Sequence, residues 1–539
     1  MKMPKNHSLF VVVSFFFFSC SSFENKAQVP DTSIQITAGE SEAPGSFIVN
    51  SGVKFDSTAI GKFISENPLF KEFKKDFETF YRANNFNYVW YDKNGLVETS
   101  NALISAINDI EQQGVSAKVP YKDSLEQLLH SATDTNNVTA PDITIELMLT
   151  GQYFFYAEKI WEGALNKKAD SINWYIPKKK LSYSALLEEN LKGGKIADIN
   201  GPVVVEAQYL GLKKALAQYR EIEKKGNEVV IPALKGTAVI KVRDTAAIVA
   251  AVRKRLYQLR YTDSEDSGKV YDTALATTIT QVKARYGLKI ETAINNSFIN
   301  ALNVPAKKRE EQIMVNMERL RWIPADTSGE FILVNIPEYA LTYYENTKPA
   351  WRCGVVVGKP MTKTVIFSGD MRYVVFSPYW NVPTSIIKKE IKPGMARNKN
   401  YLAKHNMEWN GGRVRQKPGP SNSLGLVKFL FPNSNNIYLH DTPSKSLFNE
   451  TNRAFSHGCI RVSQPKELAI RVLRQYPEWT PAKINTAMHT GREQYVTLKR
   501  TIPVYIGYFT AFLDEGGQVN FRTDIYQRDD RLLNILMEH

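Results

Sequence analysis

Two short segments of the chain hold the residue types best suited to covalent chemistry. Residues 456–459 read Ser-His-Gly-Cys, and residues 438–441 read Tyr-Leu-His-Asp. The chain has only three cysteines and seven histidines, so a cysteine this close to two histidines is unusual. Thiols attack as thiolates, and a nearby imidazole can take the thiol proton. The pattern predicts that Cys459 is a nucleophile with a histidine partner.

The two histidines are not equivalent as candidates for the base. His440 follows the apolar run Ile437–Leu439, which predicts a strand, and the fifteen residues between His440 and Ser456 leave room for a returning strand beside it. His457, by contrast, must bend back across Gly458 to reach the thiol. Asp441 comes next on the strand and should point to the other face. We therefore expect His440 to be the base, with a backbone carbonyl holding its ring.

Gly458 allows the chain to turn sharply beside the nucleophile. In such a turn the backbone N–H groups of Gly458 and Cys459 can face a developing oxyanion. The catalytic candidates are therefore Cys459, His440, His457 and Gly458. Pro465 suits the first turn of a helix, so the thiol should lie just before a passage from strand to helix.

Three other interpretations of the cysteines remain open. Cys459 can be a buried cysteine beside a satisfied histidine, or a zinc ligand, although no further cysteine or histidine ligands appear at recognisable spacing. Cys353 lies in an apolar strand pattern and reads as a small buried residue, with a disulfide to Cys459 as the alternative. No pattern for a metal or another cofactor appears, and we predict none.

Several further segments carry a resemblance to a known family. They read Trp-Asn-Val-Pro at residues 380–383, Lys-Pro-Gly-Pro-Ser-Asn at 417–422, Phe-Pro-Asn at 431–433 and Tyr-Leu-His-Asp-Thr-Pro at 438–443. Together with the spacing of His440 and Cys459, they resemble the L,D-transpeptidases with a YkuD-type catalytic domain, and among these the large YcbB-like branch.

The resemblance implies a reaction on the stem peptides of peptidoglycan. Cys459 would attack the peptide bond before the terminal D-alanine of a tetrapeptide stem and form a thioester. An amine of a second stem would resolve it, linking the third residues of two stems, with His440 as general base and acid. Tyr438, Trp380, Ser456 and Arg461 would contact substrate. Arg461 stands where many members carry Asn, and can bind a substrate carboxylate or form a structural ion pair.

The predicted fold is a multidomain α+β protein. Helical periodicity dominates the first half, and period-two apolar strands begin near residue 327. Arg-Tyr-Gly-Leu at residues 285–288 partly matches a peptidoglycan-binding three-helix domain. We expect a helical scaffold at 46–243, a peptidoglycan-binding-like helical domain at 244–305, a scaffold return helix at 306–326, and a β-rich catalytic domain at 327–530 with a capping segment at 384–428.

The N-terminus predicts export. A basic start, an apolar run from Leu9 to Phe18 and a small residue before Cys20 are typical of a lipoprotein signal peptide at 1–20, with a polar tether at 21–45. We expect lipid on Cys20, a membrane-anchored protein on the periplasmic face of the cell envelope, and no nucleic-acid partner. The formal charge of +14 fits an anionic partner such as cell-wall polymer or lipid headgroups.

Other functions share these residues. Water could resolve the thioester in an L,D-carboxypeptidase, and a protein amine could resolve it in attachment of a protein to the wall. A non-catalytic wall-binding protein would use the 244–305 unit and the basic surface, but it would need neither Cys459 nor His440.

Overall fold

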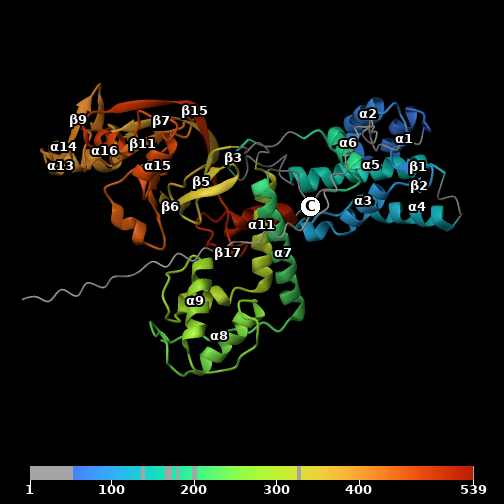
Figure 1. Ribbon diagram of the computed structural model, residues 1–539, viewed down its shortest axis with the longest axis horizontal. Coiled ribbons are helices and arrows are strands. Elements are labelled where there is room, and N and C mark those ends of the chain that lie inside the picture. The colour runs from blue at the N-terminus through green and yellow to red at the C-terminus, as the bar shows by residue number, and fades with distance from the viewer. Residues whose placement is uncertain are drawn as a thin grey trace, which may run out of the picture. The chain divides into compact units, whose positions relative to one another are not determined.

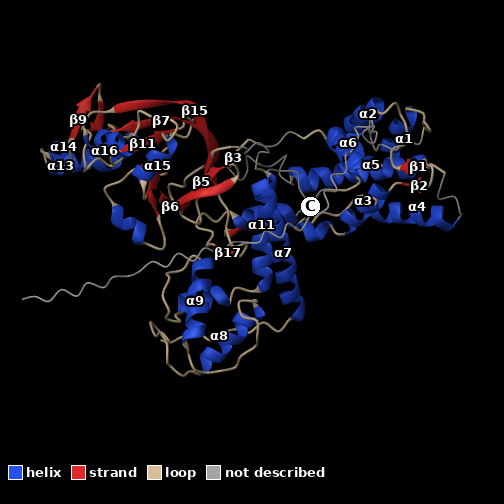
Figure 2. Ribbon diagram, in the orientation of Figure 1, coloured by secondary structure: helices blue, strands red, loops and turns tan. Residues whose placement is uncertain are grey.

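The computed structural model describes residues 52–134, 140–163, 173–177, 181–196, 203–323 and 329–537. The predicted signal peptide, Cys20, the tether and the boundary at residues 326 and 327 lie outside this set. No helix among the described residues is long and apolar enough to cross a membrane. Helices make up most of the first half and strands gather in the second, as predicted (Figure 2).

The first helices surround one fully buried helix, α5. Residues 145–157 of α5 are all buried, and the Asp142 carboxylate caps the helix by accepting from the Thr144 and Ile145 amides. Aromatic and aliphatic side chains from the neighbouring helices form the core around it. These elements are α1 (Thr58–Glu66), α2 (Lys74–Ala83), β1 (Tyr91–Asp92), β2 (Gly95–Leu96), α3 (Glu98–Asn108), α4 (Lys122–Asp134), α5 (Ile143–Ala157) and α6 (Tyr183–Gly193).

Two long helices and a small three-helix unit follow. Helix α7 (Val203–Lys225) packs beside α11 (Ala306–Arg321), the predicted return helix (Figure 1). Between them in sequence lie α8 (Ala247–Gln258), α9 (Thr273–Arg285) and α10 (Asn296–Leu302). Asp272 caps α9 and Asn295 caps α10 through their side chains. The three-helix form predicted for residues 244–305 is therefore confirmed.

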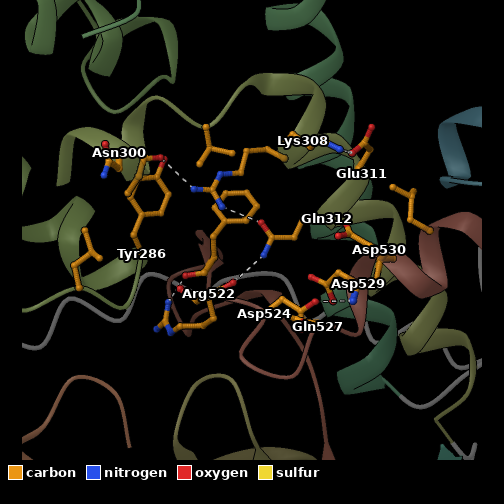
Figure 3. Close-up of a pocket in the computed structure, with 18 of the residues that line it drawn as sticks. Tyr286, Asn300, Lys308, Glu311, Gln312, Arg522, Asp524, Gln527, Asp529 and Asp530 are labelled. Carbon is orange, nitrogen blue, oxygen red and sulfur yellow. Dashed lines mark hydrogen bonds and ion pairs between the residues drawn. The ribbon is translucent and has the colours of Figure 1, made fainter. Parts of the chain in front are cut away.

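A pocket of about 560 Å³ lies where α10, α11 and the segment after β17 (Val519–Phe521) meet (Figure 3). Several of its polar side chains have partners within the protein. Lys308 forms an ion pair with Glu311 at 2.7 Å, and the Gln312 amide donates to the Arg522 carbonyl at 2.9 Å. Neither His440 nor Cys459 lines this pocket. It lies at the junction between the helical unit, α11 and the last part of the β-rich domain.

The strands of the β-rich domain close into a ring. Their order is β11-β12-β14-β6-β5-β4-β15-β7, and β11 also pairs with β7, which leaves this circuit without a free edge. Helices α15 (Pro465–Val472) and α16 (Pro481–His489) follow β14. The strands are β4 (Phe331–Asn335), β5 (Ala340–Glu345), β6 (Lys348–Gly358), β7 (Ile366–Phe376), β11 (Val427–Leu430), β12 (Leu439–His440), β14 (Ile460–Val462) and β15 (Gln494–Gly507).

Smaller elements complete the domain. Strand β3 (Trp174–Tyr175) adds to β7, and β13 (Ala454–Ser456) pairs with β6. Strands β16 (Ala511–Leu513) and β17 form a hairpin before the last helix, α17 (Asp529–Met537).

The segment predicted as a cap is a folded subdomain. It contains α12 (Thr384–Ile386), a π-helix at Ile387–Ile391, α13 (Lys392–Arg397), α14 (Tyr401–Lys404), β9 (Met407–Asn410) and β10 (Arg413–Gln416), with β8 (Trp380–Asn381) completing its sheet. Its own hydrophobic cluster includes Val382, Ile391 and Val414. The predicted end at 428 is too late, because Val427 and Lys428 belong to β11 of the ring. We call residues 380–416 the cap.

Candidate active site

The segments that carry His440 and Cys459 lie on neighbouring parallel strands. Leu439 of β12 pairs with Ile460 of β14, and His440 pairs with Arg461. One step earlier, the Ile460 amide donates to the Tyr438 carbonyl at 3.1 Å. Because side chains alternate along a strand, Tyr438, His440, Cys459 and Arg461 share one face of this strand pair. The prediction that a paired strand brings His440 beside the cysteine segment is confirmed.

The Cys459 side chain is partly exposed, and its thiol contacts several protein groups. Its Sγ atom lies 3.7 Å from the Asn436 carbonyl oxygen, which accepts the S–H hydrogen. Burial raises the pKa of the thiol, while hydrogen bonds from the Tyr438 amide and hydroxyl and the charge of Arg461 act in the opposite direction. Because burial dominates, the thiol needs a base at the moment of attack.

The geometry and the charge state of His440 both suit it to act as that base. Its Nδ1 atom lies 2.5 Å from the Asp441 carbonyl oxygen, which can only accept, so Nδ1 carries the hydrogen and Nε2 keeps its lone pair. Burial and the positive charge of Arg461 lower the His440 pKa to about 3, so the ring is neutral. A backbone carbonyl holds the ring, as predicted. Among the described residues, no hydrogen bond joins the ring to the thiol.

The Asp441 side chain faces a different set of partners. Its carboxylate accepts from the Leu426 amide at 2.8 Å and the Thr442 amide at 2.7 Å, and it forms an ion pair with Lys445. The expectation that this side chain does not orient His440 is confirmed.

A hydrogen-bonded turn connects Ser456 to Cys459. The Ser456 hydroxyl donates to the Cys459 carbonyl at 2.5 Å and accepts from the Gly458 amide at 3.1 Å. Gly458 has a φ of 123°, a conformation that favours glycine, and its carbonyl accepts from the Thr364 hydroxyl at 2.9 Å. The Gly458 amide is therefore committed to the turn, and the expectation that it faces an oxyanion is wrong for this conformation. The Cys459 amide has no acceptor among the described residues.

Ser456 and Arg461 differ in what they can offer a substrate. Ser456 is only 2% exposed, and its hydroxyl both donates and accepts a hydrogen bond within the turn. Arg461 is partly exposed, forms no ion pair with a carboxylate within the described ranges, and has a buried Nε atom without a hydrogen-bond partner. The structural ion pair considered for Arg461 therefore finds no acidic partner there.

His457 contacts the cap, and Trp380 is part of it. The His457 Nε2 atom lies 3.4 Å from the Glu390 Oε1 atom in the π-helix of the cap. Trp380 is on β8 and packs against the hydrophobic cluster of the cap. Neither side chain shares the strand face that carries Cys459.

Sequence reasoning missed Asn436 and Thr364. Asn436 adopts a φ of 52°, and its carbonyl contacts the thiol. The Asn-Ser-Asn-Asn run at 433–436 is typical of a turn and could have indicated this position. Thr364 comes from the loop between β6 and β7, nearly a hundred residues before the turn it supports, so no local pattern could have pointed to it.

The other described cysteine, Cys353, is buried and free. Burial raises its pKa to about 11, as suits an inert thiol. Cys459 is also free, so the two form no disulfide. In the part of the chain that the structure describes, no group of three His, Cys, Asp or Glu side chains could hold a metal ion.

Known proteins resemble separate parts of the chain. A family model described as the L,D-transpeptidase catalytic domain (YkuD) matches residues 329–506, and one described as a scaffold domain matches residues 75–216. A putative L,D-transpeptidase of Haemophilus influenzae is 34% identical over 253 residues, or 42% of this chain and 51% of the relative. The chain thus spans about half the length of this curated relative.

Solved structures were also found, at low similarity. An L,D-transpeptidase from Xylanimonas cellulosilytica is 14% identical with a TM-score of 0.18, covering 51% of this chain and 99% of that one. One from Mycobacterium smegmatis is 11% identical with a TM-score of 0.20, covering 34% and 60%.

The chain combines a helical region with a β-rich domain in which a cysteine and a histidine face the same side of paired strands. Residues 329–506 match the model of the YkuD-type L,D-transpeptidase catalytic domain, and the match to a scaffold domain precedes them. The multidomain α+β arrangement expected from the sequence is confirmed.

Proposed function

We propose that the protein is an L,D-transpeptidase that cross-links the third residues of two peptidoglycan stems through a thioester on Cys459. The match of residues 329–506 to the catalytic domain of this family supports the general activity. The observation that carries the proposal is the parallel pairing of β12 with β14, which puts His440 and Cys459 on one face.

Acylation begins with transfer of the thiol proton. The thiol rotates away from the Asn436 carbonyl, and the neutral His440 ring takes its proton at Nε2. The sulfur then attacks the carbonyl carbon before the terminal D-alanine. The Cys459 amide donates to the oxyanion, since the Gly458 amide is held by Ser456. His440 returns the proton to the leaving nitrogen, the C–N bond breaks, and D-alanine departs.

An amine from a second stem completes the reaction. It attacks the thioester carbonyl, a C–N bond forms, the C–S bond breaks, and its proton passes through His440 back to the thiolate. In this scheme Tyr438 contacts the thiol and lines the site, and Arg461 binds substrate. Ser456 holds the turn instead of contacting substrate, and His457 joins the turn to the cap, where Trp380 packs.

The same acyl-enzyme allows two other outcomes. Attack by water gives an L,D-carboxypeptidase, and attack by a protein amine attaches that protein to the wall. A wall-binding protein without catalysis would rely on the helical unit at 244–305, but binding alone requires no neutral histidine beside a thiol.

The site of action follows from the substrate. Peptidoglycan lies in the cell envelope, and lipid on Cys20 would hold the enzyme at the membrane on the periplasmic face.

Mass spectrometry can test the proposal directly. The purified protein is incubated with tetrapeptide muropeptides, and both the products and Cys459 are analysed. A dimer that has lost one D-alanine, together with a Cys459 adduct, supports transpeptidation. A tripeptide product without dimer indicates hydrolysis. If either product forms without an adduct on Cys459, the assigned chemistry is wrong.

A further inference from the structure

The carbonyl of Gly458 and the amide of Cys459 belong to one peptide unit, so a contact that fixes the carbonyl also fixes the amide. The unit is planar and trans, and its C=O and N–H bonds therefore point in opposite directions. The Thr364 hydroxyl donates to the Gly458 carbonyl at 2.9 Å. The Cys459 N–H thus points away from Thr364, and within the described part of the chain it has no acceptor. This amide is the donor that the proposed mechanism assigns to the oxyanion.

Thr364 is itself held on two sides. Its hydroxyl accepts from the Gly358 amide at 2.9 Å, so its single hydrogen goes to Gly458. Its own amide donates to the Tyr526 hydroxyl at 3.2 Å, and that hydroxyl donates to the Gly358 carbonyl at 2.7 Å. Tyr526 therefore connects the two ends of the loop between β6 and β7. Thr364 and Tyr526 are 0% and 1% exposed, so these bonds are shielded from water.

The loop between β6 and β7 is tightly closed around these contacts. A Cβ atom at Gly358 would lie 2.1 Å from the Thr362 carbonyl oxygen and 2.8 Å from the Thr364 nitrogen, so no side chain fits there. The loop also holds the other end of the catalytic turn, because the Thr362 hydroxyl donates to the Ser456 carbonyl at 3.0 Å. Loop and turn are therefore joined at both Ser456 and Gly458.

Tyr526 comes from the segment after β17, beyond the part of the chain that matches the catalytic-domain model. Its amide donates to the Tyr508 hydroxyl at 2.8 Å, and Tyr508 donates to the Asp524 carboxylate. Asp524 also accepts from the Asp529 amide at 2.7 Å (Figure 3). Asp529 in turn forms an ion pair at 2.7 Å with Arg319 of α11. A series of polar contacts therefore connects α11 to the catalytic turn through Tyr526.

We propose that Tyr526 is a positioning residue for the oxyanion donor: through Thr364 it fixes the Gly458–Cys459 peptide unit with its N–H directed at the substrate carbonyl. This inference rests on the proposed function and deepens it. Tyr526 exchanges no proton with the substrate. Its two hydrogen bonds set the direction of the amide before negative charge develops on the carbonyl oxygen. The segment after β17 is therefore part of the catalytic apparatus.

Two reactions of the same thiol separate positioning of the amide from support of the fold. Acylation by a tetrapeptide muropeptide forms an oxyanion that the Cys459 amide must bind, whereas alkylation by iodoacetamide is a direct displacement without an oxyanion. Single-turnover acylation is followed by the intact mass of the protein at several donor concentrations. Alkylation of Cys459 across pH and thermal unfolding are measured on the same variants.

Tyr526→Phe should slow the maximal rate of acylation about 10-fold, as expected for the loss of one buried hydrogen bond. Thr364→Val should slow it about 10²-fold, the lower end of the cost of losing an oxyanion donor, and Thr364→Ser, which keeps the hydroxyl, should recover most of the rate. The double variant should be no slower than Thr364→Val, because Tyr526 acts through Thr364. The half-saturating donor concentration and the alkylation profile should not change, since the defect is confined to the transition state.

Tyr343→Phe is the matched control. It also removes the hydroxyl of a buried tyrosine in the β-rich domain, one that donates to Glu330 at 3.1 Å, and it should acylate at the parental rate. Parental acylation in Tyr526→Phe, equal slowing of acylation and alkylation, or failure of this variant to fold would overturn the inference and leave the proposed function intact. Equal rates in Thr364→Val and Thr364→Ser would also overturn it. No acyl-enzyme in the unaltered protein would instead overturn the proposed function and the inference with it.

Discussion

The imidazole of His457 meets the carboxylate of Glu390 at 3.4 Å, so the turn that carries Cys459 touches the cap. Both side chains are about half exposed. Exposed pairs of this kind contribute at most about 1 kcal/mol, so the contact aligns the cap with the catalytic turn but cannot hold it there strongly. His457 therefore has a structural connection to the cap that His440, buried under the strand pair, does not have.

Replacing Cys459 by Ala should abolish cross-linking and D-alanine release while leaving the fold intact. The side chain supplies the attacking sulfur, and within the described residues its hydrogen-bonding partners are Asn436 and Tyr438. Turnover is measured with muropeptides, and the fold by circular dichroism and thermal unfolding. Retained turnover in a folded Cys459→Ala protein would refute the nucleophile assignment.

His440→Ala should slow acylation by about 10²–10⁴-fold, the usual cost of losing a general base. His457→Ala should slow it much less, because this ring contacts the cap and not the thiol. The acylation rate of each variant can be measured with a thiol-reactive carbapenem. Equal losses, or a larger loss in His457→Ala, would reverse the assigned roles.

Ser456→Ala should destabilise the catalytic domain by about 1–3 kcal/mol and slow acylation. The change removes a buried hydroxyl and leaves the Gly458 amide without its acceptor. The exposed Ser444, which lies outside the turn, provides the matched control Ser444→Ala. Urea unfolding followed by tryptophan fluorescence compares the two. Similar midpoints would show that the Ser456 hydroxyl contributes nothing to stability.

Removal of the cap should lower cross-linking more than D-alanine release. The Val382 amide donates to the Val414 carbonyl at 3.0 Å, so a short Gly-Ser loop between these residues can replace 383–413 without breaking the β8–β10 pair. A closed cap excludes water and so favours an amine acceptor. The ratio of dimer to hydrolysed product is measured by chromatography. A shortened protein that folds and keeps the parental ratio would exclude a catalytic role for the cap.

Because Glu146 is buried, we expect the stability of the helical scaffold to depend on pH. Burial raises its pKa from 4.5 to about 7, so the folded scaffold holds an extra proton between these values. Its unfolding free energy should therefore fall as pH rises through that window, by about 3 kcal/mol in total.

Glu146→Gln should flatten this dependence, and Glu126→Gln, at an exposed position, should not. Thermal unfolding between pH 4.5 and 7.5 checks both variants. A slope that is unchanged in Glu146→Gln would show that this carboxyl does not cause the effect.

The alternation of side chains along strands was enough to predict much of the site. The apolar run before His440 and the apolar residues after Cys459 were enough to predict two paired strands, because such runs must be buried. The same alternation correctly separated the His440 ring from the Asp441 side chain. Pro465 also begins α15 as predicted, and Gln464 at the helix N-cap makes no side-chain hydrogen bond there.

Other parts of the site depend on contacts that no local pattern contains. Gly458 permits a turn, but whether its amide faces an oxyanion or Ser456 depends on the rotamer of Ser456. The Asn436 carbonyl reaches the thiol only because a left-handed residue ends the preceding turn. Pairing of β11 with β7 brings together residues about fifty positions apart. This pairing showed that the predicted capping segment ends before β11.

The position of β15 in the ring has a consequence for biosynthesis. This strand pairs with β4 and with β7, yet residues 494–507 form it, well after Cys459. While the polypeptide is still being synthesised, the nucleophile and the base both emerge before the ring can close. A nascent chain therefore has every reactive side chain but no finished catalytic face. Termination of translation just before residue 494 should give a protein that retains Cys459 and His440 and is inactive.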